Sequence, residues 1–233
     1  NKKNKKFLKK SRIIILILAI ISIVVLCFLF MPNFKVENPY ENTTKISLIV
    51  GDSLELIGSE KTSTNLPIIK NNVVYLPFNI LKKYVDKNIF WDEDNKTLTI
   101  TTLKKLIRLH PNSEKYSINY KDYNLGIPIE IINNEVYVPQ NFLDTVYHNI
   151  KINYILKNNV VTLDDKKNNI TYGKVNKHNQ TLRNGDSIKS SIIRKVTPDE
   201  EFIILEDKKE NKYTKIRTYD GFIGYIKTSK IYI

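Results

Sequence analysis

Three clusters of acidic side chains come nearest, by residue type and spacing, to catalytic chemistry. Hydrolysis of a glycosidic bond needs two carboxyl groups held across a cleft. The sequence offers Asp92-Glu93-Asp94, Asp164-Asp165 and Asp199-Glu200-Glu201. Each cluster falls where the surrounding pattern predicts a turn, and acidic residues at turns are mostly solvated. We therefore predict no catalytic carboxyl pair among them.

Other reaction chemistries lack the residues that they need. The serines lie in polar loops without the Gly-x-Ser-x-Gly pattern of a nucleophile elbow, and the seven glycines form no phosphate-binding loop. His110, His148 and His178 are far apart in the sequence, whereas a copper site requires clustered imidazoles. The sequence thus predicts no catalytic residue, no cofactor-binding residue and no metal site. Whether the chain is the non-catalytic part of an enzyme stays open.

Binding chemistry has better candidates near the end of the sequence. The side chains that could stack on a sugar or peptide are Tyr213, Tyr219, Phe222 and Tyr225. The alternative is that Tyr213 and Phe222 fill a core while the other two cover its edge. Lys208, Lys209, Lys212, Lys215 and Arg217 could attract anionic polymers. Acidic residues are mixed into this stretch, which favours a solvated strand face instead.

The first thirty residues predict a membrane anchor. Residues 1–12 hold seven basic residues and no acidic one, and Ile13–Met31 carries no charge. As a helix, a stretch of this length spans about 28 Å, close to the hydrocarbon thickness of a bilayer. It lacks the small-residue cleavage pattern of a secretory signal peptide. We therefore expect an uncleaved single-pass anchor rather than a cleaved signal, with residues 1–12 in the cytoplasm and the bulk of the chain exported.

The charge and cysteine content fit an exported protein. The formal net charge of +13 falls to +6 without the first twelve residues, because 30 basic and 24 acidic residues remain. This modest charge argues against a nucleic-acid partner. The single cysteine, Cys27, lies in the apolar stretch, so the exported part has no disulfide. Its stability must come from packed apolar cores, which fits the cell surface of a Gram-positive bacterium.

A short pattern occurs twice in the exported part. Residues 71–86 and 133–148 agree at seven of sixteen positions, among them an Asn-Asn pair and the Tyr-x-Pro that follows it. Each copy predicts a hairpin around Asn-Asn, then a short amphipathic helix after the proline, with Asn79 as the N-cap of the first. We expect two α+β modules, each an antiparallel sheet with one short helix. Modules of about 60 residues are small for a stable core, so the two are expected to pack together.

The remaining segments complete the expected organisation. The pattern after residue 169 predicts an all-β barrel with strands near Ile192–Val196, Glu201–Glu206, Tyr213–Thr218 and Phe222–Ile226. The predicted parts are a basic segment at 1–12, a transmembrane helix at 13–31, a linker at 32–44, modules at 45–102 and 103–168, and the barrel at 170–233.

Two of these parts resemble known families. The hairpin, the helix and the ending Phe90-Trp91-Asp92 with Lys96-Thr97-Leu98-Thr99-Ile100 make the doubled unit similar to the copper amine oxidase N-terminal-like domain of exported Gram-positive proteins. That resemblance implies a stalk and no oxidase chemistry. Residues 181–187 (TLRNGDS), 212–217 (KYTKIR) and 220–226 (DGFIGYI) resemble a bacterial SH3-like domain. Such domains occur in cell-wall proteins, and some bind peptidoglycan.

The order of these parts leaves two functions open. The first is a non-catalytic, membrane-anchored envelope protein whose stalk and barrel contact cell-wall glycan or peptidoglycan. The order also resembles the N-terminal half of membrane-anchored family 18 glycoside hydrolases of clostridia. The alternative is therefore the targeting portion of such an enzyme, of the chitinase or peptidoglycan hydrolase type, with its catalytic barrel beyond Ile233. A sensor is disfavoured because only about twelve residues stay in the cytoplasm.

Overall fold

The computed structural model describes residues 17, 19–23, 36–62, 65–166, 170–178, 180–206 and 212–233. Of the predicted anchor, residues 17 and 19–23 are described, and they are helical; the rest of Ile13–Met31 lies outside the described residues. Within the described ranges, no helix is both long enough and apolar enough to cross a membrane. The chain divides into two compact units, Asn1–Lys35 and Val36–Ile233, and the second carries all the strands considered below.

The two sequence repeats form the same elements, 62 residues apart. The first copy has β3 (Ile68–Lys70), β4 (Val73–Pro77) and α2 (Phe78–Tyr84), and the second has β10 (Glu130–Ile132), β11 (Glu135–Pro139) and α3 (Gln140–Val146). Asn71 and Asn72 have φ of 49° and 64°, and Asn133 and Asn134 have φ of 49° and 62°. Positive φ at both central residues is the type I′ hairpin turn, which asparagine tolerates. The predicted hairpins are confirmed.

The start of the first helix differs from the prediction. Its N-cap is Pro77 rather than Asn79, and no side chain caps it from that position. The backbone N–H of Asn79 instead donates to the Glu135 carboxylate of the second copy at 3.1 Å. A carboxylate at a helix N-terminus is favourable because the unpaired N–H groups there carry partial positive charge. One copy thus supplies the cap of the other copy's helix.

The two copies pair with each other through equivalent residues. Leu76 of β4 lies opposite Val138 of β11, Tyr75 opposite Pro139, and Pro77 opposite Tyr137. Since Val138 is the repeat counterpart of Leu76, the two copies are related here by a local twofold axis. The resulting four-stranded sheet has the order β10-β11-β4-β3.

The flanking sheets also combine strands of both copies. One sheet has the order β12-β13-β1-β2, from Ile150–Ile155, Val160–Asp165, Ser47–Val50 and Ser53–Leu56. The other has the order β5-β6-β7-β8-β9, from Ile89–Asp92, Thr97–Thr101, Leu106–Leu109, Lys115–Ile118 and Lys121–Asn124. The prediction of a separate antiparallel sheet in each module therefore differs from the structure, which interlocks the modules.

Connection length explains the pairing of the flanking strands. The short connection from β6 to β7 joins antiparallel neighbours, as a short loop must. The partners β1 and β13 are far apart in the sequence, and they run parallel. The first and last strands of the doubled unit thus lie side by side and close it.

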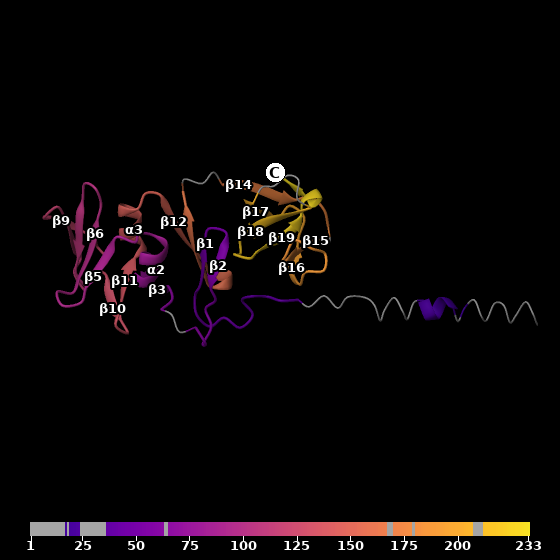
Figure 1. Ribbon diagram of the computed structural model, residues 1–233, viewed down its shortest axis with the longest axis horizontal. Coiled ribbons are helices and arrows are strands. Elements are labelled where there is room, and N and C mark those ends of the chain that lie inside the picture. Colours follow the sequence, from indigo (N-terminus) through magenta and orange to yellow (C-terminus); the bar gives the residue numbers. More distant parts are fainter. Residues whose placement is uncertain are drawn as a thin grey trace, which may run out of the picture. The chain divides into compact units, whose positions relative to one another are not determined.

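The C-terminal part is one antiparallel sheet, which we call the C-terminal sheet. Its order is β16-β15-β19-β18-β17-β14-β20, from Ile192–Val196, Gln180–Arg183, Ile223–Lys227, Tyr213–Thr218, Glu201–Glu206, Thr171–Val175 and Ile231–Tyr232 (Figure 1). The four predicted strands are present, while β14, β15 and β20 were not predicted. Its similarity to an SH3-like domain stays a prediction.

Two apolar cores share the sheet that contains β1 and β13. Leu48 and Val161 pack in a first core with residues from all the sheets of the doubled unit. Ile49 and Val160, on the opposite face of the same strands, pack in a second core with residues of the C-terminal sheet, such as Phe202. Successive side chains of a strand point to opposite faces, so one sheet can serve both cores. The doubled unit and the C-terminal sheet are therefore joined through one sheet that borders both cores.

Candidate functional site

The four aromatic residues predicted for ligand binding have different environments. Phe222 is buried, and its ring centroid lies 5.0 Å from that of Tyr40. Tyr213 and Tyr225 are partly buried on the neighbouring strands β18 and β19. Tyr219, in the turn between these strands, exposes 55% of its surface. Phe222 thus belongs to the core, and Tyr219 is the best placed of the four to meet a ligand.

Tyr219 lies at a hollow with two other exposed tyrosines. Tyr172 of β14 and Tyr232 of β20 expose 52% and 66% of their surfaces, and with Tyr219 they line a hollow of about 480 Å³. Lys174 and Glu201 line it as well, and their ammonium and carboxylate groups form an ion pair at 2.7 Å. We call this hollow the tyrosine cleft. Its apolar walls with a few polar groups resemble those of ligand sites in general.

The sequence of β14 explains how the tyrosine cleft forms. Along Thr171–Val175, Tyr172 and Lys174 are exposed while Gly173 and Val175 are buried, as alternation along a strand requires. A Cβ on Gly173 would lie 2.6 Å from the Phe202 ring and 2.8 Å from the Tyr232 carbonyl oxygen. Glycine is therefore needed there for β20 to approach β14. That approach places Tyr232 beside Tyr172.

A second hollow, of about 530 Å³, adjoins the tyrosine cleft. Tyr219 and Glu201 line both, and the second hollow adds the charged residues Lys157, Arg194, Asp199, Glu200 and Asp220. Burial, together with the charge of Glu201, raises the pKa of the Tyr219 hydroxyl, so it stays a neutral donor and acceptor at pH 7. The hydrogen bond to Glu201 raises the pKa of Lys174, which stays charged. The joined surface thus offers aromatic faces beside charged groups of both signs.

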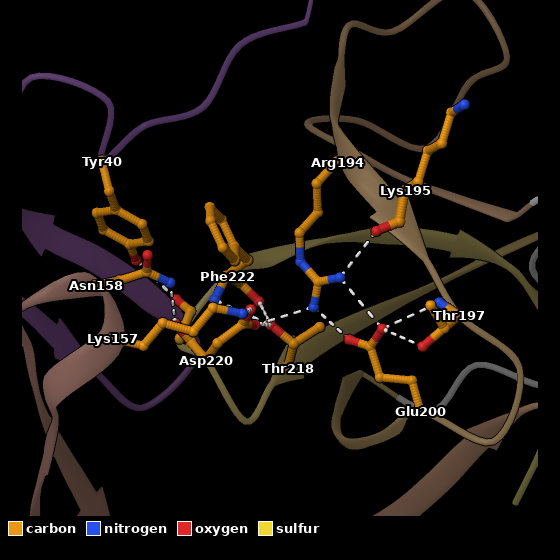
Figure 2. Close-up of polar contacts among 11 residues, drawn as sticks. Tyr40, Lys157, Asn158, Arg194, Lys195, Thr197, Glu200, Thr218, Asp220 and Phe222 are labelled. Atoms are coloured by element: carbon orange, nitrogen blue, oxygen red, sulfur yellow. Dashed lines mark hydrogen bonds and ion pairs between the residues drawn. The ribbon is translucent and has the colours of Figure 1, made fainter.

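A hydrogen-bond network fixes the turn that carries Tyr219 (Figure 2). Thr218 Oγ1 and Arg194 Nη2 both donate to Asp220 Oδ1, at 2.6 and 2.9 Å, and Lys157 Nζ donates to Asp220 Oδ2 at 2.9 Å. Asn158 Nδ2 donates to the Asp220 carbonyl oxygen at 2.6 Å. Residues on both sides of Tyr219 are therefore held in place. Two of these donors, Lys157 and Asn158, come from the doubled unit.

The network also sets the charge of Asp220. Burial alone would raise the pKa of this carboxyl, but the hydrogen bonds from Thr218 and Lys157 and the positive charge of Arg194 outweigh it, and the pKa is lowered. Asp220 is therefore ionised at neutral pH.

The acidic clusters take part in structural contacts. Glu200 pairs with Arg194, Glu201 with Lys174, and Asp164 with Arg217. In the first cluster, Glu93 pairs with Lys96, and Asp92 Oδ1 accepts hydrogen bonds from the backbone N–H groups of Asp94 and Asn95. Asp164 and Asp165 are the last residues of β13, so the turn predicted for this cluster is wrong, whereas Glu93, Asp94 and Asp199 do lie in turns.

The three histidines follow different elements: His110 follows β7, His148 follows α3 and His178 follows β14. His110 Nδ1 lies 3.2 Å from Thr97 Oγ1 in the sheet β5–β9, whereas His178 lies beyond β14. In the part of the chain that the structure describes, no group of three histidine, cysteine or acidic residues could hold a metal ion.

Comparison with known proteins finds one matching family model, which covers part of the chain. Residues 55–163 match the copper amine oxidase N-terminal domain. No curated protein matches the chain. The match runs from β2 to β13 and covers both copies, in agreement with their interlocked sheets. It supports the stalk-domain interpretation of this region, while the tyrosine cleft belongs to the sequence after it.

Sequence reasoning found Tyr219 but missed Tyr172 and Tyr232. The signal for Tyr172 was present, because TYGKV alternates outward polar or aromatic residues with small or apolar ones. Tyr232 carried no comparable signal, since a two-residue strand shows no period. Only the pairing of β14 with both β17 and β20 brings the residues of the cleft together.

Proposed function

We propose that this chain is a membrane-anchored, exported protein of the cell envelope that contacts cell-wall glycan or peptidoglycan without catalysing its breakdown. The doubled unit, which matches the copper amine oxidase N-terminal domain, serves as a rigid support. The C-terminal sheet supplies the contact through the tyrosine cleft. The observation that carries the proposal is the convergence of Tyr172, Tyr219 and Tyr232 on one hollow.

The chemistry of the tyrosine cleft suits wall polymers. Sugars and short peptides present apolar C–H faces together with many hydrogen-bonding groups. Tyrosine rings offer flat apolar area with a hydroxyl at the edge, and they are ordered at little cost in side-chain entropy. The Lys174–Glu201 pair adds one donor and one acceptor group at the wall of the hollow. A ligand with both polar and apolar faces could thus be held without a covalent step.

The anchor in this proposal rests on the sequence. The uncharged stretch Ile13–Met31 follows seven basic residues, which predicts a cytoplasmic N-terminus. The test is flotation of the chain with lipid vesicles. Full chain should float, and a variant without residues 13–31 should stay in the dense fraction. Equal behaviour of the two would contradict anchoring.

Wall contact is tested separately by sedimentation with purified, insoluble peptidoglycan, using the full chain in detergent. Tyr219→Ala should lower the affinity for peptidoglycan, measured by sedimentation, about 5- to 30-fold. This is the effect expected from losing an aromatic contact worth about 1–2 kcal/mol. Phe90→Ala is the matched control, because Phe90 is 58% exposed but lies on β5, in the doubled unit. Sedimentation no greater than that of an unrelated protein, or equal loss in both variants, would contradict the proposal.

The hydrolase alternative rests on the resemblance in the order of the parts. In this alternative, the chain is the targeting portion of a longer protein that hydrolyses wall polymer with a catalytic barrel beyond Ile233. Both proposals expect the same contact through the tyrosine cleft.

A further inference from the structure

The first residues of the second compact unit are bound to the C-terminal sheet. Val36 forms a parallel bridge with Ile192 of β16, and the Glu37 backbone N–H donates to the Ile192 carbonyl oxygen at 2.8 Å. Asn184 Nδ2, in the loop between β15 and β16, donates to the Glu37 carboxylate at 3.4 Å. The Asn184 side chain thus joins this loop to residues 36–40, which we call the entry segment.

Tyr40 connects the entry segment to the turn that carries Tyr219. Tyr40 is only 7% exposed, its hydroxyl donates to the Gly221 carbonyl oxygen at 2.7 Å, and its ring packs on Phe222. Burial raises the pKa of this hydroxyl, so it keeps its proton and the hydrogen bond. Because Gly221 lies two residues after Tyr219, a firmly bound entry segment supports one edge of the tyrosine cleft.

The loop that holds Glu37 contains the only asparagine of the sequence that glycine directly follows, Asn184-Gly185. Asn184 is exposed, and residues 184–191 lie outside the strands, so water reaches the side chain and no strand pairing fixes the backbone of the pair. A Cβ on Gly185 would lie 2.7 Å from Ser190 Oγ, which explains why a glycine occupies this position. The missing Cβ also leaves the Gly185 nitrogen sterically open. Asparagine amides are chemically labile, and this pair is the most open to attack.

We propose that Asn184 is a site of spontaneous deamidation and that its product loosens the entry segment. The Gly185 backbone nitrogen attacks Cγ of Asn184 and forms a succinimide ring. The bond from Cγ to Nδ2 breaks, and ammonia leaves with the proton of the Gly185 N–H. Water then adds its hydroxyl to Cγ, which gives aspartate, or to the backbone carbonyl carbon, which gives isoaspartate, and its proton returns to the nitrogen. The sum is hydrolysis of one amide by one water, without an oxidant or a reductant.

The product reverses the contact with Glu37. A carboxylate replaces the amide that donates to the Glu37 carboxylate, so an attraction becomes a repulsion between like charges. Residues 184–191 contain one acidic residue, Asp186, and one basic residue, Lys189, so deamidation takes the loop from no net charge to −1. Isoaspartate also lengthens the backbone next to the hydrogen bond from the Asn184 N–H to the Ser191 carbonyl oxygen, at 3.1 Å. Because the pair is at the surface, we expect opening of the entry segment to increase about 3- to 5-fold.

Peptide mapping by mass spectrometry tests the site, using the full chain in detergent held warm at mildly alkaline pH. Trypsin releases residues 184–189 and 109–115 as separate peptides, because each follows an arginine and ends in lysine. The second peptide provides an internal control, since Asn112 is also exposed but precedes Ser113. The 184–189 peptide should lose its amide and separate into aspartate and isoaspartate forms while Asn112 keeps its amide. Equal retention at both positions would overturn the modification site.

Hydrogen exchange tests the consequence, because amide exchange reports local opening. Asn184→Asp should speed exchange in the entry segment about 3- to 5-fold, with a smaller increase at residues 218–222. Asn184→Ala removes the donor without adding a charge and should have less effect, and Asn112→Asp should have none. The aged wild-type chain provides the same measurement on a protein that folded before the change. Unchanged exchange in both Asn184→Asp and the aged chain would overturn the link to the entry segment. Neither experiment uses lipid or peptidoglycan, so both are independent of the proposed function.

Discussion

Replacement of Asp164 by alanine should destabilise the whole second unit, because it breaks a buried ion pair between the doubled unit and the C-terminal sheet. Both guanidinium Nη atoms of Arg217 donate to the Asp164 carboxylate at 2.8 Å, and Nη1 also donates to the Gly51 carbonyl oxygen at 2.9 Å. The Arg217 side chain is 6% exposed and that of Asp164 12%. Without Asp164, a buried cation keeps one uncharged acceptor.

The expected loss follows from this burial. Removing one member of a buried ion pair costs about 3–5 kcal/mol. The Gly51 carbonyl oxygen remains as an acceptor, so we expect about 3 kcal/mol, the lower end of that range. For a unit of this size, each kcal/mol lowers the melting temperature by about 2–4 °C, or about 6–12 °C in all.

Urea unfolding of residues 36–233 measures this with two probes. The first probe is the fluorescence of the single tryptophan, Trp91, which lies in β5 and packs against the first core. The second is far-UV circular dichroism, which reports on all strands. Since one sheet borders both cores, Asp164→Ala should lower both midpoints together. The matched control is Asp52→Ala, which breaks the ion pair of the 59% exposed Asp52 with Lys215 and should cost less than about 1 kcal/mol. An unchanged Trp91 midpoint with an early partial dichroism transition would refute a single cooperative unit.

Three further changes test the local structure. Leu76→Ala and Val138→Ala, at the twofold contact between the copies, should each lower the free energy of unfolding by about 2–4 kcal/mol in urea titrations. Leu156 is 78% exposed, so Leu156→Ala should cost little. Equal effects of the three substitutions would contradict the shared core. Asn72→Val should cost about 1–2 kcal/mol because φ is 64° there, and Asn72→Gly should be neutral; a tolerated valine would contradict the turn. The lowered pKa of Asp220 adds stability above about pH 4, which is lost as the pH falls through its folded-state pKa, so Asp220→Asn should flatten the acid limb of a stability–pH curve; an unchanged limb would refute this role.

Local signals predicted the hairpins and short helices of the doubled unit. The Asn-Asn pairs mark type I′ turns because asparagine tolerates the positive φ at both positions. The helix after each proline followed from apolar residues at helical spacing, such as Ile80 and Leu81, which are both buried. Asn119 and Tyr120 form another turn with two positive φ values, and it was missed, together with β9 after it, because tyrosine is unusual there.

Long-range pairing was beyond local signals. The pairing of β1 with β13 depends on how the whole intervening chain folds. The residues of the two strands do not by themselves indicate which strand each one pairs with. In the structure, Ser47–Val50 and Val160–Asp165 contain runs of successive buried residues. Such runs are typical of strands buried on both faces. Their second packing partner is the C-terminal sheet.

The candidate site was predicted in part for the same reason. The position of Tyr219 in a turn between two strands followed from Asp220-Gly221, where Gly221 has φ of 87°. Phe222, just before β19, is buried in the second core, as the alternative weighed for it expected. Tyr172 and Tyr232 come from strands that were not predicted, although the alternation along TYGKV was a signal for the strand of Tyr172.

The central claim, that the tyrosine cleft contacts the cell wall, is tested most directly by a binding isotherm on purified peptidoglycan. The full chain in detergent is compared with the double variant Tyr172→Ala, Tyr219→Ala and with Phe90→Ala. The account predicts saturable binding that the double variant loses and the Phe90 variant keeps, with all three folded by circular dichroism. Undiminished binding by the folded double variant would contradict it.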